Sequence, residues 1–315
     1  MKPVILLTGT NGQVGSELTR ILPSFGDVTA LDRRRLDLSK PNEIRSVIRA
    51  VRPTLIVNAA AYTAVDKAES DEAAARAINA EAPAVMAEEA KKLGASLFHY
   101  STDYVFDGSK TTPYEESDPT NPQNVYGKTK LDGEHAIQQS GVSHLIFRTA
   151  WVYATQGRNF FLTILRLATQ REELRIARDQ IGAPTVSREI AKSTAEILAR
   201  IYGREQSPLS LAEVSGIYHM TASGETSWYD FAKAILEEAK VIVPDTPWFA
   251  AATGNLPLIA RRVIPIATNE DSTPARRPAY SVLSNARLAR IFSLRLPAWR
   301  TQLHSVFADH SSKGL

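Results

Sequence analysis

The first half of the chain alternates between short apolar runs of β type and segments with helical periodicity. Branched aliphatic residues dominate the runs, whereas apolar residues recur about every 3.6 positions between them. The predicted strands are Val4–Thr8, Asp27–Leu31, Thr54–Asn58 and Ser96–Ser101, and the predicted helices are Ser16–Leu22, Lys40–Val51 and Glu69–Leu93, the last interrupted at Pro83. Parallel strands need a long crossover, which a helix normally supplies. The alternation predicts an α/β fold with a doubly wound, Rossmann-like parallel sheet.

The periodicity weakens after a loop-like segment at 105–125. A helix at 124–139 and a strand at 143–152 are predicted next, followed by helices at Phe160–Gln170, Arg188–Tyr202, Trp228–Ala239 and Ala286–Phe292. Strands near Arg175–Ala177 and at Ile217–Thr221 are expected to complete the parallel sheet. We therefore predict a dinucleotide-binding domain at 1–150, completed by parts of 175–222, and a smaller mixed α/β substrate lobe at 151–315 that is interleaved with it.

Composition excludes several classes of function. The chain has 315 residues, a formal net charge of +3 and no cysteine, so a disulfide, a thiolate nucleophile or a cysteine zinc site is impossible. This small, evenly spread charge does not indicate nucleic-acid binding. Gly9 and Asn11 end the apolar start before a signal peptide or membrane span is complete, so we expect a cytoplasmic protein without a membrane partner. The scattered histidines show no metal-binding spacing, and no metal site is expected.

A glycine-rich turn follows the first predicted strand. Gly9, Gly12 and Gly15 form the sequence GTNGQVG, in which backbone N–H groups at the next helix N-terminus can approach a pyrophosphate. The spacing is one residue longer than the GxGxxG fingerprint, and plain turn glycines are the alternative. We expect the whole turn to contact a dinucleotide, including its intervening residues Asn11, Gln13 and Val14.

An acidic residue ends the second predicted strand. Asp32 lies about twenty residues after the glycine turn, where an acid hydrogen-bonds the adenine ribose of a dinucleotide. Arg33 and Arg34 follow it, and a guanidinium there can pair with the 2′-phosphate of NADP, although a solvated charge run is the alternative. We expect NADPH to be preferred with NADH tolerated, and Asp37 and Leu38 to border the adenine.

The strongest chemical signal is the pair Tyr126 and Lys130 on a predicted helix. Four residues apart, the two share one helix face, whereas Lys128 points elsewhere and should be dispensable. Reducing a ketone by hydride requires a proton donor, and a phenol is a poor one unless a cation stabilises its phenolate. Lys130 can supply that charge and can also bind the nicotinamide ribose. An exposed tyrosine and lysine without a role are the alternative.

Thr102 closes a predicted strand at the carboxyl edge of the sheet, where open α/β folds bind ligands. Its hydroxyl can hydrogen-bond a substrate carbonyl, although strand-end threonines often only cap the following turn. The glycine turn, Asp32, the segment Asn58–Ala61, Thr102 and the Tyr126 pair occur in an ordered series along the chain, which chance alone does not readily produce.

With these motifs the sequence resembles the extended short-chain dehydrogenase/reductase superfamily, and more closely the dTDP-4-dehydrorhamnose reductase family. The resemblance runs nearly end to end and is carried by LTGTNGQVG, VNAAAYTAVDKAE, HYSTDYVFDG, NVYGKTKLDGE, FRTAWVY, DQIGAPT and RRPAYSVL. It implies reduction of the C4 ketone of dTDP-4-dehydro-β-L-rhamnose by NADPH or NADH, which gives dTDP-L-rhamnose for bacterial surface polysaccharides such as the O-antigen of lipopolysaccharide.

The resemblance also assigns roles to individual residues. It implies that Tyr126 donates the proton, that Lys130 is its partner and that Thr102 orients the carbonyl. It places Ala59, Ala60 and Ala61 on the nicotinamide side, Thr63, Val65, Asp103, Tyr104 and Trp151 against the substrate, with the Trp151 indole on the thymine ring, and Gln180 and Arg277 near the diphosphate.

One departure from the family pattern and two alternatives remain. Some family members hold Mg²⁺ at a dimer contact through glutamates, but the matching positions here carry Arg188 and Arg300, which speaks against that metal and that dimer. A monomer and a homodimer both stay open. An extended short-chain epimerase or 4,6-dehydratase is one alternative, although Asp103 lacks the adjacent glutamate of a dehydratase. A non-catalytic subunit resembling the regulatory partner of methionine adenosyltransferase is the other, and the intact Thr102, Tyr126 and Lys130 argue against it.

Overall fold

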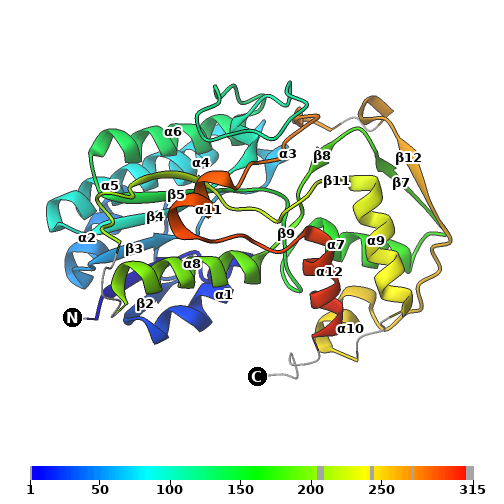
Figure 1. Cartoon of the computed structure of the whole chain (residues 1–315), viewed down its shortest axis with the longest axis horizontal. Helices are drawn as coiled ribbons and strands as arrows, with labels where there is room; N and C mark the ends of the chain where they lie inside the picture. Colours follow the sequence, from blue (N-terminus) through cyan, green and yellow to red (C-terminus); the bar gives the residue numbers. More distant parts are fainter. Residues whose placement is uncertain (1, 204–208, 242–244, 271–272, 310–315) are drawn as a thin grey trace.

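A six-stranded parallel sheet forms the larger of two lobes (Figure 1). The computed structural model describes residues 2–203, 209–241, 245–270 and 273–309. The strand order is β10-β5-β4-β3-β1-β2. The chain adds β2 on one side of β1 and then β3 and the later strands on its other side, as in doubly wound folds. The strands are β1 (Val4–Thr8), β2 (Asp27–Leu31), β3 (Leu55–Asn58), β4 (Ser96–Thr102), β5 (His144–Thr149) and β10 (Gly216–His219).

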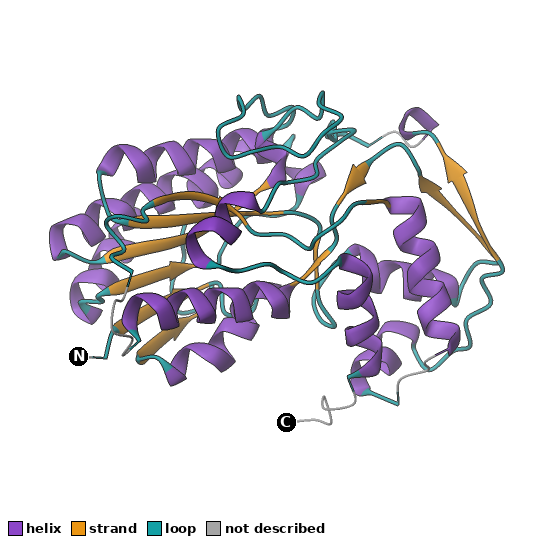
Figure 2. Cartoon of the chain, viewed as in Figure 1, coloured by secondary structure: helices purple, strands orange, loops and turns teal. Residues whose placement is uncertain are grey.

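Helices cover both faces of this sheet (Figure 2). Successive strand residues point to opposite faces, so Ile5 and Leu7 pack on one side and Leu6 on the other. One face is covered by α1 (Gln13–Ile21), α8 (Ser187–Tyr202) and α11 (Ala286–Phe292), and the other by α2 (Pro41–Val51), α5 (Ala82–Leu93) and α6 (Val125–Ser140). Burial on both faces explains why these strands are continuous apolar runs in the sequence.

The smaller lobe has a separate aromatic core that includes Phe161, Phe231 and Phe307. Its elements are α7 (Phe160–Ala168), α9 (Trp228–Val241), α10 (Pro247–Thr253), α12 (Trp299–Ala308) and the parallel pair β7 (Glu173–Ala177) with β12 (Arg262–Ile266). Two-residue strands connect it to the sheet, namely β6 (Val152–Tyr153) with β9 (Thr185–Val186), and β8 (Ile181–Gly182) with β11 (Thr226–Ser227). Because α8, β10 and α11 return to the large lobe, the two lobes are interleaved in sequence.

The predicted fold class is confirmed, and most predicted elements occur within a few residues of their expected bounds. The predicted strand at 217–221 joins the sheet as β10, beside β5. The strand near 175–177 does not join this sheet: it is part of β7, which pairs with β12 in the smaller lobe. Leu174 of β7 is buried in the aromatic core of the smaller lobe, and this burial favours the placement of β7 there.

The predicted long helix Glu69–Leu93, with an interruption at Pro83, is confirmed from Glu72 onward. It consists of α4 (Glu72–Arg76), a π-helical turn (Ala77–Glu81) and α5, which follow one another without a break, and a short helix, α3 (Val65–Ala68), precedes it. Pro83 is the second residue of α5, directly after the π-helical turn, so the hydrogen-bond pattern of the helix changes next to the residue that has no N–H group. The π turn just before it buries Asn79, whose amide bonds to the backbone of Tyr62. Over the part of the chain that the structure describes, no helix is long and apolar enough to cross a bilayer.

Candidate active site

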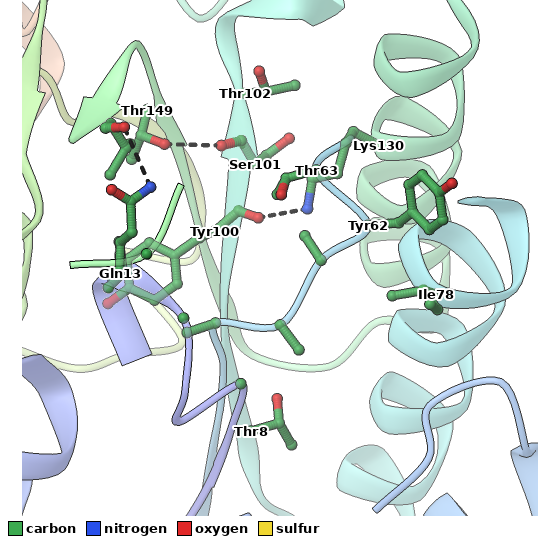
Figure 3. A pocket seen from close by; sticks show the side chains of 18 of the residues that line it. Thr8, Gln13, Tyr62, Thr63, Ile78, Tyr100, Ser101, Thr102, Lys130 and Thr149 are labelled. Atoms are coloured by element: carbon green, nitrogen blue, oxygen red, sulfur yellow. Dashed lines mark hydrogen bonds between the residues drawn. The ribbon is translucent and has the colours of Figure 1, made fainter. Parts of the chain in front are cut away.

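A cavity of about 760 Å³ lies at the carboxyl edge of the sheet, beside the smaller lobe (Figure 3). Most of the predicted site residues line it. They are Gly9, Asn11, Gly12, Gln13, Val14, Asp32, Arg33, Asp37, Leu38, Ala59, Ala60, Ala61, Thr63, Val65, Thr102, Asp103, Tyr104, Tyr126, Lys130 and Trp151. Parallel strands that end at one edge bring these distant sequence segments together.

The glycine turn between β1 and α1 can close only because glycine occupies the positions where two backbone segments approach each other most closely. Gly9 has φ +77°, and a Cβ atom there would lie 2.5 Å from the amide nitrogen of Ala60. Gly15 lies outside the cavity wall, but a Cβ on it would come within 2.0 Å of the Gly9 carbonyl oxygen, so it allows the turn to close. Gly12 begins α1 without a side-chain cap, which leaves N–H groups at the helix N-terminus for an anion.

Asp32 is held at the end of β2 by its own turn. Its carboxylate accepts hydrogen bonds from the N–H groups of Arg34 and Arg35, both at 3.1 Å, and from the Asn11 amide at 3.2 Å. Partial desolvation acts against ionisation, but these donors lower the pKa of Asp32 below its ordinary value. Among the arginines that follow, Arg33 lines the cavity and Arg34 does not.

Lys130 is almost completely buried, with 1% of its surface exposed. Its Nζ donates a 2.6 Å hydrogen bond to the carbonyl oxygen of Tyr100, drawn in Figure 3, and lies 3.1 Å from Nε2 of His99. Burial lowers its pKa to about 8, against the opposing effect of the Glu134 carboxylate. Lys128, two residues earlier, is exposed and does not line the cavity, in agreement with the prediction that it points elsewhere.

Tyr126 lies one helical turn before Lys130 and lines the same cavity. Asn124 caps α6 by accepting the Gly127 N–H at 2.8 Å, and a Cβ on Gly127 would lie 2.2 Å from the Tyr104 carbonyl oxygen, so the helix start is tightly placed. Burial raises the pKa of Tyr126 to about 12, the Thr102 hydroxyl lowers it, and Asp103 raises it. Because Lys130 bonds to β4 in this geometry, its stabilisation of the phenolate stays a prediction.

Thr102 and Asp103 form a small polar cluster at the end of β4. The Thr102 hydroxyl donates to Oδ1 of Asp103 at 3.1 Å and accepts the N–H of Tyr104 at 3.2 Å. Asp103 is 2% exposed, and its Oδ2 has no hydrogen-bond partner among the described residues. Burial raises the pKa of Asp103 to about 7, although the hydroxyl groups of Ser281 and Thr102 oppose this shift. The cavity therefore holds a carboxyl group whose ionisation is disfavoured by burial.

Two stacked indoles form the cavity wall next to the smaller lobe. Trp151 adopts φ +47°, which is unusual for a residue with a side chain, and stacks on Trp228 with ring centroids 3.4 Å apart. A Cβ on Gly182 would lie 2.4 Å from the Trp151 ring, which explains the glycine in DQIGAPT. Trp228 was not predicted as a site residue, because its place depends on how the lobes interleave.

Two predicted substrate contacts lie outside the cavity wall. The Gln180 amide donates to the Thr268 hydroxyl at 3.1 Å, and Arg277 pairs with the Asp66 carboxylate at 2.8 Å. Their roles near a diphosphate stay predictions. Within the described ranges, no three or more histidine, aspartate or glutamate side chains gather as a metal site would require.

Comparisons with known proteins identify the family. The model described as the RmlD substrate binding domain matches residues 1–312. The chain belongs to this family. The dTDP-4-dehydrorhamnose reductase of Burkholderia thailandensis is 49% identical over 296 residues, 94% of this chain and 95% of the relative. The reductase of the same name from Escherichia coli is 44% identical over 300 residues, 94% of each chain.

Solved structures agree with this membership. The crystal structure of dTDP-4-dehydrorhamnose reductase from Bacillus anthracis, in complex with NADP, matches with a TM-score of 0.84 at 31% identity. The match covers 98% of this chain and 99% of that chain. The family resemblance predicted from the sequence motifs is thereby confirmed.

The buried Asp103 predicts a pH dependence of stability. Its pKa rises from 3.8 when unfolded to about 7 when folded, so the folded chain binds more protons and loses stability as pH rises between these values. Asp103→Asn removes this loss, and we expect it to be more stable than the parent chain at pH 8 by roughly 2–4 kcal/mol, with a smaller difference at pH 5. Urea unfolding at both pH values measures the difference.

Asp107→Asn is the matched control. Hydrogen bonds from Ser109 and Asn121 lower the pKa of Asp107 to about 2, so its contribution is present above the ordinary value and is lost only in acid. Asp107→Asn should therefore lose stability between pH 5 and pH 8 to the same extent as the parent chain. The interpretation of Asp103 is wrong if Asp103→Asn and the parent chain change in parallel between pH 5 and 8.

Proposed function

We propose that the chain is a dTDP-4-dehydrorhamnose reductase, which reduces the C4 ketone of dTDP-4-dehydro-β-L-rhamnose to dTDP-L-rhamnose. The observation that carries the proposal is one cavity that joins the glycine turn to Thr102, Tyr126 and Lys130 in a chain of this family. The named relatives at 49% and 44% identity, and the relative solved with NADP, support it. The reaction belongs to dTDP-rhamnose and surface polysaccharide biosynthesis.

The residues at the carboxyl edge fit a dinucleotide. Backbone groups of the glycine turn would hold the pyrophosphate, Asp32 the adenine ribose and Arg33 a 2′-phosphate, while Asp37 and Leu38 would border the adenine. The backbone of Ala59–Ala61 would lie on the nicotinamide side. Bound NADPH or NADH would supply the hydride.

Thr102, Tyr126 and Lys130 then have separate roles in the proton transfer. The Thr102 hydroxyl orients the carbonyl oxygen, and the Tyr126 phenol gives that oxygen its proton as the alkoxide forms. Lys130, when protonated, stabilises the resulting phenolate. Burial raises the pKa of the Tyr126 phenol to about 12 in the free chain, so a protonated Lys130 would favour the phenolate that forms during turnover.

The remaining polar and aromatic groups of the wall would hold the sugar nucleotide. Thr63, Val65, Asp103 and Tyr104 would contact the sugar, and the Trp151 indole offers an apolar face to the thymine. Gln180 and Arg277, which bond to Thr268 and Asp66 in the free chain, would contact the diphosphate. We further propose that the enzyme acts in the cytoplasm on this small-molecule substrate, as a monomer or a homodimer.

Loss of the Tyr126 hydroxyl should abolish turnover but not cofactor binding. We expect Tyr126→Phe to lower kcat for NADPH oxidation with dTDP-4-dehydrorhamnose by about 10²–10⁴-fold, because the phenol that protonates the alkoxide is then missing. NADPH binding, followed by fluorescence titration, should be unchanged. Lys128→Ala is the control and should keep full activity, since this side chain is exposed. Normal turnover by Tyr126→Phe would exclude the phenol as proton donor.

Arg33 and Arg34 offer a matched pair for testing cofactor choice. Arg33 lines the cavity beside Asp32, whereas Arg34 does not. We expect Arg33→Ala to raise the KM for NADPH roughly tenfold while the KM for NADH changes little, since a charge-assisted contact to phosphate is lost. Arg34→Ala should affect both cofactors slightly. Equal effects of Arg33→Ala on the two KM values would rule out a phosphate contact.

A further inference from the structure

A row of buried polar side chains crosses three neighbouring strands and ends at Lys130. The Thr8 hydroxyl donates to Oδ1 of Asn58 at 2.7 Å, and Nδ2 of Asn58 lies 3.0 Å from Nδ1 of His99. Nε2 of the same histidine lies 3.1 Å from Nζ of Lys130. These residues are at most 2% exposed. Thr8 pairs in register with Asn58, and Asn58 with His99, so the sheet itself aligns the row.

The orientation of the Asn58 amide is fixed by its neighbours. Its Oδ1 accepts the Ala60 N–H at 3.2 Å as well as the Thr8 hydroxyl. A backbone N–H can only donate, so Oδ1 and not Nδ2 must face Ala60. The amide nitrogen therefore points at His99, and Nδ2 is also a group that can only donate.

This orientation sets the protonation pattern of His99. Nδ1 must accept from Asn58, so in the neutral ring the proton lies on Nε2. That N–H points at Lys130, whose Nζ must then present a lone pair. A neutral amine can do this while it donates to the Tyr100 carbonyl, but an ammonium group cannot.

We propose that His99 is a positioning residue whose hydrogen-bond polarity, set by Asn58, holds Lys130 as a neutral amine in the cofactor-free chain. Charging Lys130 then requires the opposite polarity, with the proton of His99 on Nδ1 and Oδ1 of Asn58 turned towards it. Turning the amide breaks the bond to the Ala60 N–H, a group in the cavity wall. The charge of Lys130 is thus coupled to the backbone that would meet a bound nicotinamide.

The charged and titratable groups around His99 and Lys130 do not remove the requirement for a neutral amine at Lys130. From α6, Glu134 favours the ammonium form, but Arg148 of β5 donates hydrogen bonds to both of its oxygens. Asp103 after β4 and Tyr126 of α6 line the same cavity, and burial raises the pKa of both. The phenol of Tyr100 is engaged with Thr194 on the opposite face of the sheet from its carbonyl contact. Burial also lowers the pKa of His99, so a doubly protonated ring is disfavoured.

The tautomer of His99 can be measured without any assay of activity. We expect long-range ¹H–¹⁵N NMR spectra of the ¹⁵N-histidine-labelled chain to show an unprotonated Nδ1 and a protonated Nε2 for His99, assigned by the signal lost in His99→Gln. In Asn58→Asp the new carboxylate accepts from Nδ1, so the tautomer should reverse. A His99 that already carries its proton on Nδ1 in the parent chain would overturn the proposal.

The catalytic consequence rests on the proposed function and appears in the pH profile. Activity that needs the Lys130 ammonium falls as pH rises, and Asn58→Asp should move this alkaline fall of kcat upward by about one pH unit or more, because His99 then accepts from the ammonium. His99→Gln should move it in the same direction, since a rotatable amide can also accept, and it serves if Asn58→Asp does not fold. If Asn58→Asp and His99→Gln fold but show the alkaline fall of kcat at the same pH as the parent chain, His99 does not control the charge of Lys130 during catalysis.

One control variant and the activity of the parent chain distinguish the ways in which the proposal could fail. Asn79→Asp places a carboxylate at an equally buried asparagine that bonds to Tyr62 and Thr129 and not to His99, so it should leave the His99 tautomer unchanged. A reversed tautomer in Asn79→Asp would mean that buried charge alone explains the effect, which overturns the specific role of Asn58. If the parent chain shows the predicted tautomer but no reductase activity, the proposed function fails while the inference about Lys130 is supported.

Discussion

The burial of the Lys130 side chain at the end of β4 is the constraint on which the site depends. An amine removed from water must either lose its charge or find close partners. Here its Nζ is held between the Tyr100 carbonyl and the His99 ring. The position of Lys130 is thereby fixed, and with it the helical turn that carries Tyr126. The same burial lowers the pKa of Lys130, so that this side chain can change its charge during a proton transfer.

The surrounding fold supplies the rigidity that this arrangement needs. Arg148 of β5 binds the carboxylate of Glu134 one turn after Lys130, and both side chains are nearly inaccessible to solvent. Ser101 of β4 donates to the same carboxylate at 2.5 Å, so α6 is anchored to two strands. The glycine turn closes against the backbone at Ala60. Cofactor and proton donor are therefore expected to meet across a sheet edge that can move little.

The sequence predicted the sheet because buried parallel strands are continuous apolar runs, and it predicted most of the cavity wall because motifs at strand ends meet at one edge. It failed where tertiary pairing decides the outcome. The strand that contains Arg175 pairs inside the smaller lobe, and Trp228 reaches the cavity only through the interleaving of the two lobes. His99 resembled an ordinary strand residue, since its partner Asn58 is identified only by the strand register.

Deuterium transfer tests the central claim most directly, because it distinguishes a net reduction from a reaction that regenerates its own cofactor. The chain would be given dTDP-4-dehydrorhamnose and NADPH carrying deuterium at C4, each diastereomer in turn, and the product would be analysed by mass spectrometry and NMR. The account predicts one deuterium at C4 of dTDP-L-rhamnose from one diastereomer only, with matching consumption of NADPH. An unlabelled product from both diastereomers, formed without loss of NADPH, would contradict it.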